Sequence, residues 1–270
     1  MRVLLTNDDG IQATGLNALR RALLDVPGVE LSVVAPNANQ SATARSITTR
    51  RPLEVEEVDF GDGSVGYATD GTPVDCVRMA SLGLVGEAPE LIVSGINHGS
   101  NLGDDVTYSG TVAAAFEGVV LGVPGIAVSQ QSLAREMDFR LGVEFDFDEA
   151  AAFTARLVEE LESLRLPTGT VLNVNCPAGD AKGARAAKLG RRIYRDRLEL
   201  RDETDGRRSY RIYGDDPSYH REDGTDFAAI ADGLIAVTPL HFDLTAAGAL
   251  EDLGGFDLDA LIRPAAQEVE

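Results

Sequence analysis

No run of apolar residues in this sequence approaches the length needed to cross a bilayer, and the first residues lack the three sections of a secretion signal. We therefore expect a cytoplasmic protein that does not bind membranes. Cysteine is scarce, since Cys76 and Cys176 stand far apart with no CxxC pair or histidine cluster beside them. This spacing argues against a zinc knuckle or a disulfide framework and favours two buried free thiols.

Basic residues are also few. The chain has 24 Lys and Arg against 44 Asp and Glu, a formal net charge of -20, and lysine occurs only as Lys182 and Lys188. The average surface field would repel long nucleic acids, although single phosphates could still bind locally. The acidic excess favours a salt-loving source, and we expect a halophilic archaeon, because salt screens the self-repulsion of a negatively charged fold.

A dinucleotide fingerprint is missing from its usual place. The first apolar run is followed by Asn7-Asp8-Asp9-Gly10 and not by GxGxxG. Without those glycines there is no cradle for a pyrophosphate, which disfavours an oxidoreductase that uses a dinucleotide.

The apolar pattern predicts strands that alternate with helices over the first two thirds of the chain. We expect strands at residues 3–5, 29–35, 91–93, 125–128 and 171–174, and helices at residues 15–24, 72–82, 109–120 and 147–164. Such alternation indicates a mainly parallel sheet covered on both faces. The predicted fold class is therefore α/β, a doubly wound sandwich of three layers.

The pattern changes after residue 176. We expect a core at residues 1–176, an extension at 177–245 and an acidic C-terminal tail at 246–270. Residues 191–211 are highly charged with weak strand alternation, which favours a hairpin-like arm. A helix at 224–233 and a strand at 234–238 should follow, and residues 244–262 could form a terminal helix.

Polar segments follow several of the predicted strands. They are residues 7–10, 36–46 and 94–99, together with residues 107–111 before a helix. In open α/β sheets, ligands bind beyond the carboxyl ends of the strands. If the strands are neighbours, these segments converge on one crevice.

Oxygen ligands without histidine or thiolate suit a hard cation such as Mg²⁺ or Mn²⁺. Asp8 and Asp9 would supply two charges, and the neutral oxygens of Ser41 and Asn97 would complete the protein's share of the ligands. Two carboxylates balance one divalent cation, so further acids would leave a negative site facing an anionic substrate. The residue types therefore favour phosphate chemistry with open coordination positions.

A phosphate could bind opposite this cation. Gly95, like Gly10 and Gly99, would let the backbone approach a ligand closely. Ser109, Gly110 and Thr111 place small residues at a helix start, where free amides and the helix dipole favour an anion. Asn97 and Asn101 could add side-chain donors.

Each of these features alone has a simpler explanation. Asn-Asp-Asp-Gly is an ordinary turn composition, Ser109 could merely cap a helix, and Ser41 lies in a polar stretch typical of an exposed loop. His98 has a pKa range that suits a proton donor, yet an exposed loop histidine without a catalytic role is the more frequent case.

Six segments together resemble the SurE (survival protein E) family of metal-dependent phosphatases. They are LLTNDDGIQATG, VVAPNANQSATARSIT, GTPVDC, IVSGINHGSNLGDDVTYSGTVAAAFEG, LNVNCP and GTDFAAIADGLIAVTPL, and they occur in order over most of the chain. The resemblance implies a Rossmann-like core with a β-rich extension that is exchanged between subunits, giving a homodimer or tetramer. His98 and Ser100 occupy positions where family members vary, which weakens His98 as a required acid.

The resemblance also implies a 5'-nucleotidase, a phosphoric monoester hydrolase that acts on nucleoside 5'-monophosphates and, less firmly, on 3'-monophosphates and short polyphosphate. Its metal positions fall on Asp8, Asp9, Ser41 and Asn97, with one divalent ion per subunit. We expect metal-assisted phosphoryl transfer to water with Asp8, Asp9 and Asn97 as the catalytic residues. The identity of the nucleophile stays open, and a non-catalytic nucleotide sensor is the alternative.

The charge balance leads to a prediction about salt. If the acidic surface is an adaptation to high salt, the midpoint of thermal unfolding should rise by several degrees between ~0.1 M and ~2 M KCl, because added ions screen the repulsion. Circular dichroism at both concentrations measures this. An unchanged or lower midpoint would remove the argument for a halophilic source.

Overall fold

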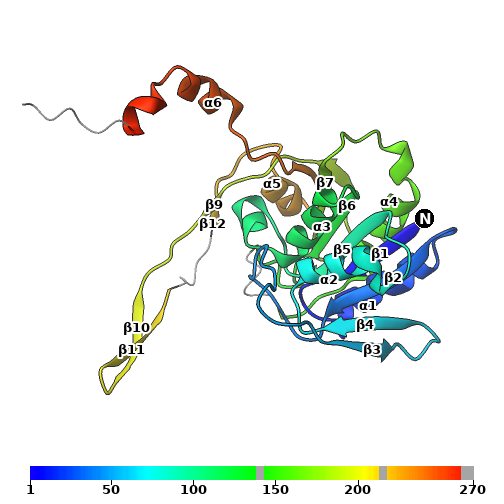
Figure 1. Cartoon of the computed structure of the whole chain (residues 1–270). Coiled ribbons are helices and arrows are strands. Elements are labelled where there is room, and N and C mark those ends of the chain that lie inside the picture. Colours follow the sequence, from blue (N-terminus) through cyan, green and yellow to red (C-terminus); the bar gives the residue numbers. More distant parts are fainter. Residues whose placement is uncertain (138–142, 213–217, 263–270) are drawn as a thin grey trace, which may run out of the picture. The chain divides into compact units, whose positions relative to one another are not determined.

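The computed structural model describes residues 1–137, 143–212 and 218–262. A central sheet forms its core (Figure 1). The order of the strands across this sheet differs from their order along the chain. The order is β3 (Val55–Asp59), β4 (Val65–Thr69), β2 (Glu30–Pro36), β1 (Arg2–Thr6), β5 (Leu91–His98), β6 (Gly125–Gln130), β7 (Thr170–Cys176), β13 (Ile235–His241) and β8 (Ala184–Ala186). The pairs from β4 to β7 are parallel, as is β13 with β8, whereas β3 runs antiparallel to β4.

Helices cover both faces of this sheet, as the alternation of strands and helices predicts. Val3 and Leu5 of β1 belong to the buried cluster that receives α1 (Thr14–Leu24) and α4 (Asp148–Glu159). Leu4, between them, belongs to a second cluster with α2 (Pro73–Met79) and α3 (Gly110–Val120). Successive side chains of a strand point to opposite faces, so one short apolar run contributes to both layers of the core.

Three elements differ from the sequence prediction. Strand β5 continues to His98, although residues 94–99 were expected to form a loop, and its register against β6 shifts between Ser94 and Asn97. The β3–β4 hairpin was missed because its outer strand is acidic and largely exposed. Helix α2 ends at Met79 and gives way to a π-helical turn at Ala80–Leu84, where Gly83 has a φ of 107°.

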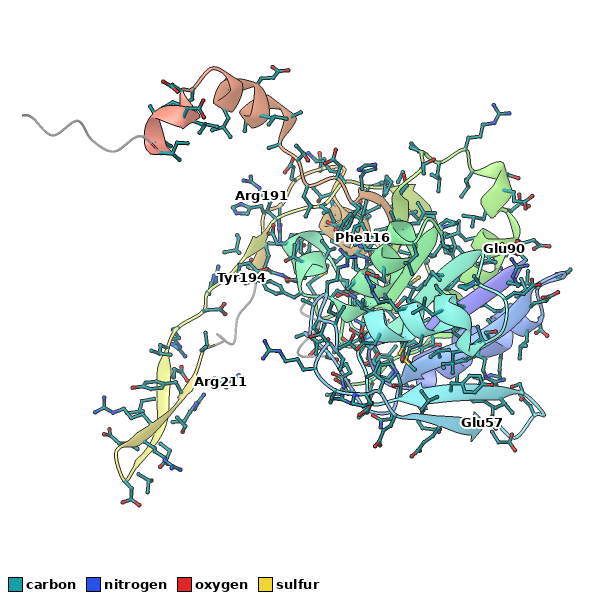
Figure 2. The ribbon with its side chains drawn as sticks, in the orientation of Figure 1. Glu57, Glu90, Phe116, Arg191, Tyr194 and Arg211 are labelled. Atoms are coloured by element: carbon teal, nitrogen blue, oxygen red, sulfur yellow. The ribbon has the colours of Figure 1, made fainter. Side chains whose placement is uncertain are left out.

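The extension both joins the sheet and carries separate small ribbons. Its strands β8 and β13 extend the central sheet beyond β7, and α5 (Asp226–Ala231) lies between them in sequence. The expected arm contains an antiparallel hairpin, β10 (Glu199–Thr204) with β11 (Arg207–Arg211), whose side chains, including Arg211, are largely exposed (Figure 2). A shorter ribbon pairs β9 (Arg192–Ile193) with β12 (Ser218–Tyr219).

Residue contacts divide the chain into Met1–Leu240 and His241–Glu270. In the second unit, α6 (Ala247–Gly254) and a 3-10 turn at Leu258–Ile262 have no buried side chains. Among the described residues no helix is both long and apolar enough to span a membrane. Both cysteines are free and buried, as predicted, and burial raises the pKa of each thiol well above its usual range.

Candidate functional site

The candidate site lies where the strand order reverses direction. Strand β1 has β2 on one side and β5 on the other, so the chain leaves β1 for one half of the sheet and later returns to build the other half. Connections at such a point part from each other and leave a crevice at the carboxyl ends of the strands. Asp8 and Asp9 lie just after β1, separated from it by Asn7, and Asn97 and His98 end β5.

Asp8 is buried against the first turn of α3. Its carboxylate accepts hydrogen bonds from Thr111 N at 3.1 Å and from Thr111 Oγ1 at 2.6 Å, and the residue is 3% exposed. A Cβ at Gly110 would lie 2.8 Å from Asp8 Oδ2. Glycine at position 110 therefore allows the helix to approach the carboxylate closely.

Asp9 joins β5 and the segment after β2. Its Oδ2 accepts a hydrogen bond from His98 N at 3.0 Å, and its Oδ1 accepts one from Asn39 Nδ2 at 3.3 Å. The side chain is 6% exposed. Gln40 N donates to Asp8 O at 2.7 Å. Ser41, the next residue along the chain, is exposed.

The four polar segments thus meet, as expected if their strands are neighbours, and hydrogen bonds to Asp8 and Asp9 connect them. Asn97, buried at the end of β5, donates from Nδ2 to Gly99 O at 2.6 Å, which leaves its Oδ1 for another partner. Gly95 has a φ of 140°, and a Cβ there would lie 2.4 Å from Val128 O. The contact that requires glycine at this position is thus with β6.

Asn101 lies in a buried amide network. Its Nδ2 donates to Ser129 Oγ at 2.8 Å, its N donates to Asn175 Oδ1, and its carbonyl oxygen accepts from Asn173 and Asn175. The side-chain amide of Asn101, which the sequence analysis proposed as a phosphate donor, therefore donates to Ser129. These bonds connect the segment after β5 to β6 and β7.

The two carboxylates share a buried site that contains no lysine or arginine side chain from the described residues. Within the described parts of the chain neither has a Lys or Arg partner, and the nearest basic atom is His98 Nδ1, 4.0 Å from Asp9 Oδ1. Burial raises the pKa of Asp8 to about 6, with the Asp9 charge adding to the effect, and burial also raises the pKa of Asp9 to about 6. A divalent cation between the two carboxylates would favour their charged forms and balance their two negative charges.

The donor chemistry of the site fits a hard divalent cation. Asp8, Asp9, Asn97 and Ser41 offer only oxygen, and no group of three His, Cys, Asp or Glu residues able to hold a metal occurs among the described residues. Two acids with neutral oxygens are typical of Mg²⁺ or Mn²⁺ sites that leave positions open to water and substrate.

The N-terminus of α3 is partly occupied by the protein itself. Thr111 N donates to Asp8, and Val112 N donates to the Ser109 Oγ cap at 3.1 Å. The positive end of the helix dipole therefore acts first on Asp8. Ser109, Gly110 and Thr111 lie beside the acidic pair, and their role as a phosphate site stays a prediction.

His98 lies in an aromatic cluster and not on an exposed loop. Its ring centroid is 5.2 Å from that of Phe145 and 5.0 Å from that of Phe147, with both pairs stacked. The side chain is 30% exposed, and burial lowers the pKa of His98. The ring presents a flat, partly exposed aromatic surface beside Asp9.

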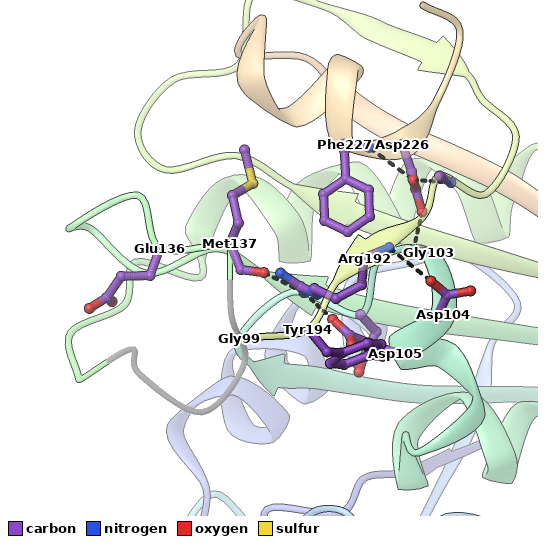
Figure 3. Close-up of polar contacts among 12 residues, drawn as sticks. Gly99, Gly103, Asp104, Asp105, Glu136, Met137, Arg192, Tyr194, Asp226 and Phe227 are labelled. Carbon is purple, nitrogen blue, oxygen red and sulfur yellow. Dashed lines mark hydrogen bonds and ion pairs between the residues drawn. The ribbon is translucent and has the colours of Figure 1, made fainter. Parts of the chain in front are cut away.

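A buried ion pair in the extension supports the segment that leads into Ser109 (Figure 3). Arg192 pairs with Asp105 and donates to Met137 O at 2.7 Å, and both charged side chains are 2% exposed. Asp226 accepts a hydrogen bond from Gly103 N at 2.7 Å. The 3-10 turn Gly103–Thr107 is thus held by residues far along the chain.

Sequence reasoning missed the residues that hold the site from outside. Asn39 and Gln40 read only as polar loop, and Phe145 and Phe147 are hidden in an acidic stretch. The alternation of Phe145 and Phe147 with Asp146 and Asp148 is the one signal that could have indicated a shared face.

The acidic pair generates a prediction about stability and pH. Because the pKa of Asp9 is raised, the folded state retains a proton that the unfolded chain releases near pH 4, and stability contributed by this group falls as pH rises towards 6. Asp9→Asn should therefore stabilise the metal-free protein by ~2 kcal/mol at neutral pH and make little difference below about pH 4. Denaturant unfolding with a chelator present measures both values.

The exposed Asp25 provides the control, since Asp25→Asn should change stability little at either pH. Equal stability of wild type and Asp9→Asn at neutral pH would contradict the assignment of a buried, uncompensated charge.

Comparison with known proteins agrees with this architecture. The family described as Survival protein SurE matches residues 3–196. The 5'-nucleotidase SurE of Rubrobacter xylanophilus is 52% identical over 268 residues, covering 97% of this chain and 99% of that protein. That of Chloroflexus aggregans is 46% identical over 256 residues, covering 94% of this chain and 98% of that protein.

Among solved structures, the crystal structure of SurE protein from Aquifex aeolicus is 35% identical, with a TM-score of 0.77 over 94% of this chain and 98% of that one. This similarity confirms the Rossmann-like α/β fold class. With a family match over most of the chain and near full-length relatives, the chain belongs to the SurE family.

Proposed function

We propose that the protein is a divalent-metal-dependent phosphomonoesterase that removes phosphate from nucleoside 5'-monophosphates. The observation that supports it most is the pair of buried acids, Asp8 and Asp9, with no basic partner at the switch point of the sheet. The relatives named 5'-nucleotidase SurE, 52% and 46% identical, support the same substrate class.

Asp8, Asp9, Ser41 and Asn97 would hold one Mg²⁺ or Mn²⁺ per subunit. When bound, the cation supplies Lewis-acid stabilisation of the charge on the phosphoryl oxygens. The two hydrogen bonds from Thr111 orient Asp8 and favour its charged form against the effect of burial, and His98 N does the same for Asp9. Asn97 and the start of α3 at Ser109–Gly110 would orient a phosphoryl oxygen from the opposite side.

Water is the acceptor that this arrangement favours. Asp8 Oδ1 and Oδ2 both accept hydrogen bonds from Thr111, which commits that carboxylate to a fixed orientation. An acid held in this way suits metal ligation better than attack on phosphorus. We also propose 3'-monophosphates as further substrates, a homodimer or tetramer in the cytoplasm, and no role for long nucleic acids.

A non-catalytic nucleotide sensor would use the same residues to bind without turnover. The two functions differ in free phosphate released from AMP in the presence of Mn²⁺. The relatives named 5'-nucleotidase SurE favour the enzyme over the sensor.

Replacement of Asp8 tests the proposal. Asp8→Asn retains the shape and can still pair with Thr111, whose hydroxyl accepts as well as donates, so the fold should survive. Removal of one of two ligand charges should lower phosphate release from AMP by at least about a hundredfold at any Mn²⁺ concentration. Asp25→Asn and a chelator-treated wild type are the controls. Near wild-type turnover by Asp8→Asn would refute the assignment.

We further propose that the His98–Phe145–Phe147 cluster contacts the nucleobase. The three rings stack within 6 Å of one another, and His98 adjoins Asp9, so a base could rest on an aromatic surface while its phosphate reaches the acids. Stacking of a base on an aromatic side chain contributes ~1–3 kcal/mol.

Substitution of Phe145 separates base binding from phosphate chemistry. Phe145→Ala should raise the KM for AMP by roughly tenfold with little change in kcat, and should leave the hydrolysis of glycerol phosphate, which has no ring, unchanged. The exposed Phe256 gives the matched control, Phe256→Ala. Equal losses on both substrates would show that Phe145 supports the fold and not the base.

A further inference from the structure

The residues between β2 and β3 include a segment without helix or strand, residues 37–48, here named the Ser41 loop. We propose that an ion pair between Arg45 and Glu117 positions the Ser41 loop over the acidic pair, so that Arg45 sets the affinity for a divalent cation without touching it. The inference rests on the proposed function, because it assigns a role towards the same metal site.

The near end of the Ser41 loop contacts the acidic pair directly. Gln40 N donates to Asp8 O at 2.7 Å, and Asn39 Nδ2 donates to Asp9 Oδ1 at 3.3 Å. Asn39 Oδ1 in turn accepts from Ser41 N at 2.9 Å. A displacement of the loop would therefore move Ser41 and disturb a hydrogen bond to each acid.

The loop backbone takes conformations that require support from outside. Ala42 has a φ of 59° and Ala44 a φ of 51°, in the left-handed region that costs alanine ~1 kcal/mol or more per residue. Such conformations persist where the surrounding structure holds them. Ala44 N donates to Tyr108 O at 3.1 Å, which is one such contact.

An ion pair joins the far end of the loop to α3, beside hydrogen bonds from Thr48 N to Asp75 Oδ1 at 3.1 Å and from Thr72 Oγ1 to Ser46 O at 2.8 Å. Arg45 Nη2 lies 2.5 Å from Glu117 Oε2, and the Glu117 side chain is 1% exposed whereas that of Arg45 is 34% exposed. Charge-assisted hydrogen bonds to a buried carboxylate are stronger than exposed ones. Arg45 is therefore anchored at its tip to a fixed point on α3.

The same helix holds Asp8. Thr111 in the first turn of α3 binds the Asp8 carboxylate, and Glu117, ~9 Å further along the helix axis, binds Arg45. An α-helix is a rigid spacer over this distance. Helix α3 therefore contacts both Asp8 and the Ser41 loop, and it fixes the position of one relative to the other.

A second arginine on the same carboxylate provides a matched control. Arg78 of α2 lies with Nη2 2.6 Å from Glu117 Oε1, and in the described residues it has no polar contact with the Ser41 loop. Its side chain is 45% exposed. Loss of either arginine leaves Glu117 with one cation, but only loss of Arg45 removes a contact of the Ser41 loop.

The experiment compares Arg45→Gln with Arg78→Gln and Arg45→Lys in the full chain. Binding of Mn²⁺ without substrate is measured by electron paramagnetic resonance. Arg45→Gln should weaken Mn²⁺ binding by roughly five- to tenfold, with kcat at saturating Mn²⁺ within about twofold of wild type. Arg78→Gln should stay within about twofold in affinity, and Arg45→Lys should restore part of the loss.

Hydrogen exchange gives a second readout. Amides of residues 37–48 should exchange faster in Arg45→Gln and at the wild-type rate in Arg78→Gln. Equal effects of the two glutamine variants on Mn²⁺ affinity, or no effect of Arg45→Gln, would overturn the positioning role.

The variant Asp8→Asn distinguishes a failure of the Arg45 proposal from a failure of the proposed metal site. If Asp8→Asn loses Mn²⁺ binding while Arg45→Gln binds as wild type does, the role of Arg45 alone is refuted. If Asp8→Asn and wild type bind Mn²⁺ equally, the metal site itself is misplaced, and the role of Arg45 falls with it.

Discussion

The structure depends on keeping two adjacent carboxylates out of water at the end of β1. Neither Asp8 nor Asp9 has a Lys or Arg partner among the described residues, and burial raises the pKa of both to about 6. Such burial is costly unless other groups stabilise the charge. Backbone amides of β5 and α3, the Thr111 hydroxyl and the Asn39 amide supply part of that stabilisation. The proposed divalent cation would supply the rest of the stabilisation, because its two positive charges balance the two carboxylates.

Helix α3 connects the chemistry to the fold. Its first turn approaches so closely that only glycine fits at position 110, and its buried face packs on the same core as Leu4 of β1. The 3-10 turn before it is held by Arg192 and Asp226 of the extension. A change in the extension can therefore reach the acidic pair through the start of α3, although the two are distant in sequence.

The sequence predicts the layers and the meeting of the polar segments because both follow from periodicity and from strand ends. Alternate residues of one run, such as Val3 and Leu4, pack on opposite faces, and parallel strands end at one edge. The sequence predicts secondary structure and burial less well at positions where tertiary contacts override the local pattern. Residues 94–98 were expected to form a loop but form strand, and Glu117, within the predicted helix at 109–120, is buried and contacts two arginines.

The charge around the site explains how an acidic protein can accept an anionic substrate. The chain carries a formal net charge of -20, which by itself would repel a phosphate ester. In the proposed site the two acids and one divalent cation would sum to zero, and neutral Ser41 and Asn97 would add nothing to that sum. Along α3, both Arg45 and Arg78 contact the buried carboxylate of Glu117. With the proposed cation bound, the crevice would therefore be close to neutral, and Debye screening limits the reach of the repulsion from the remaining acids.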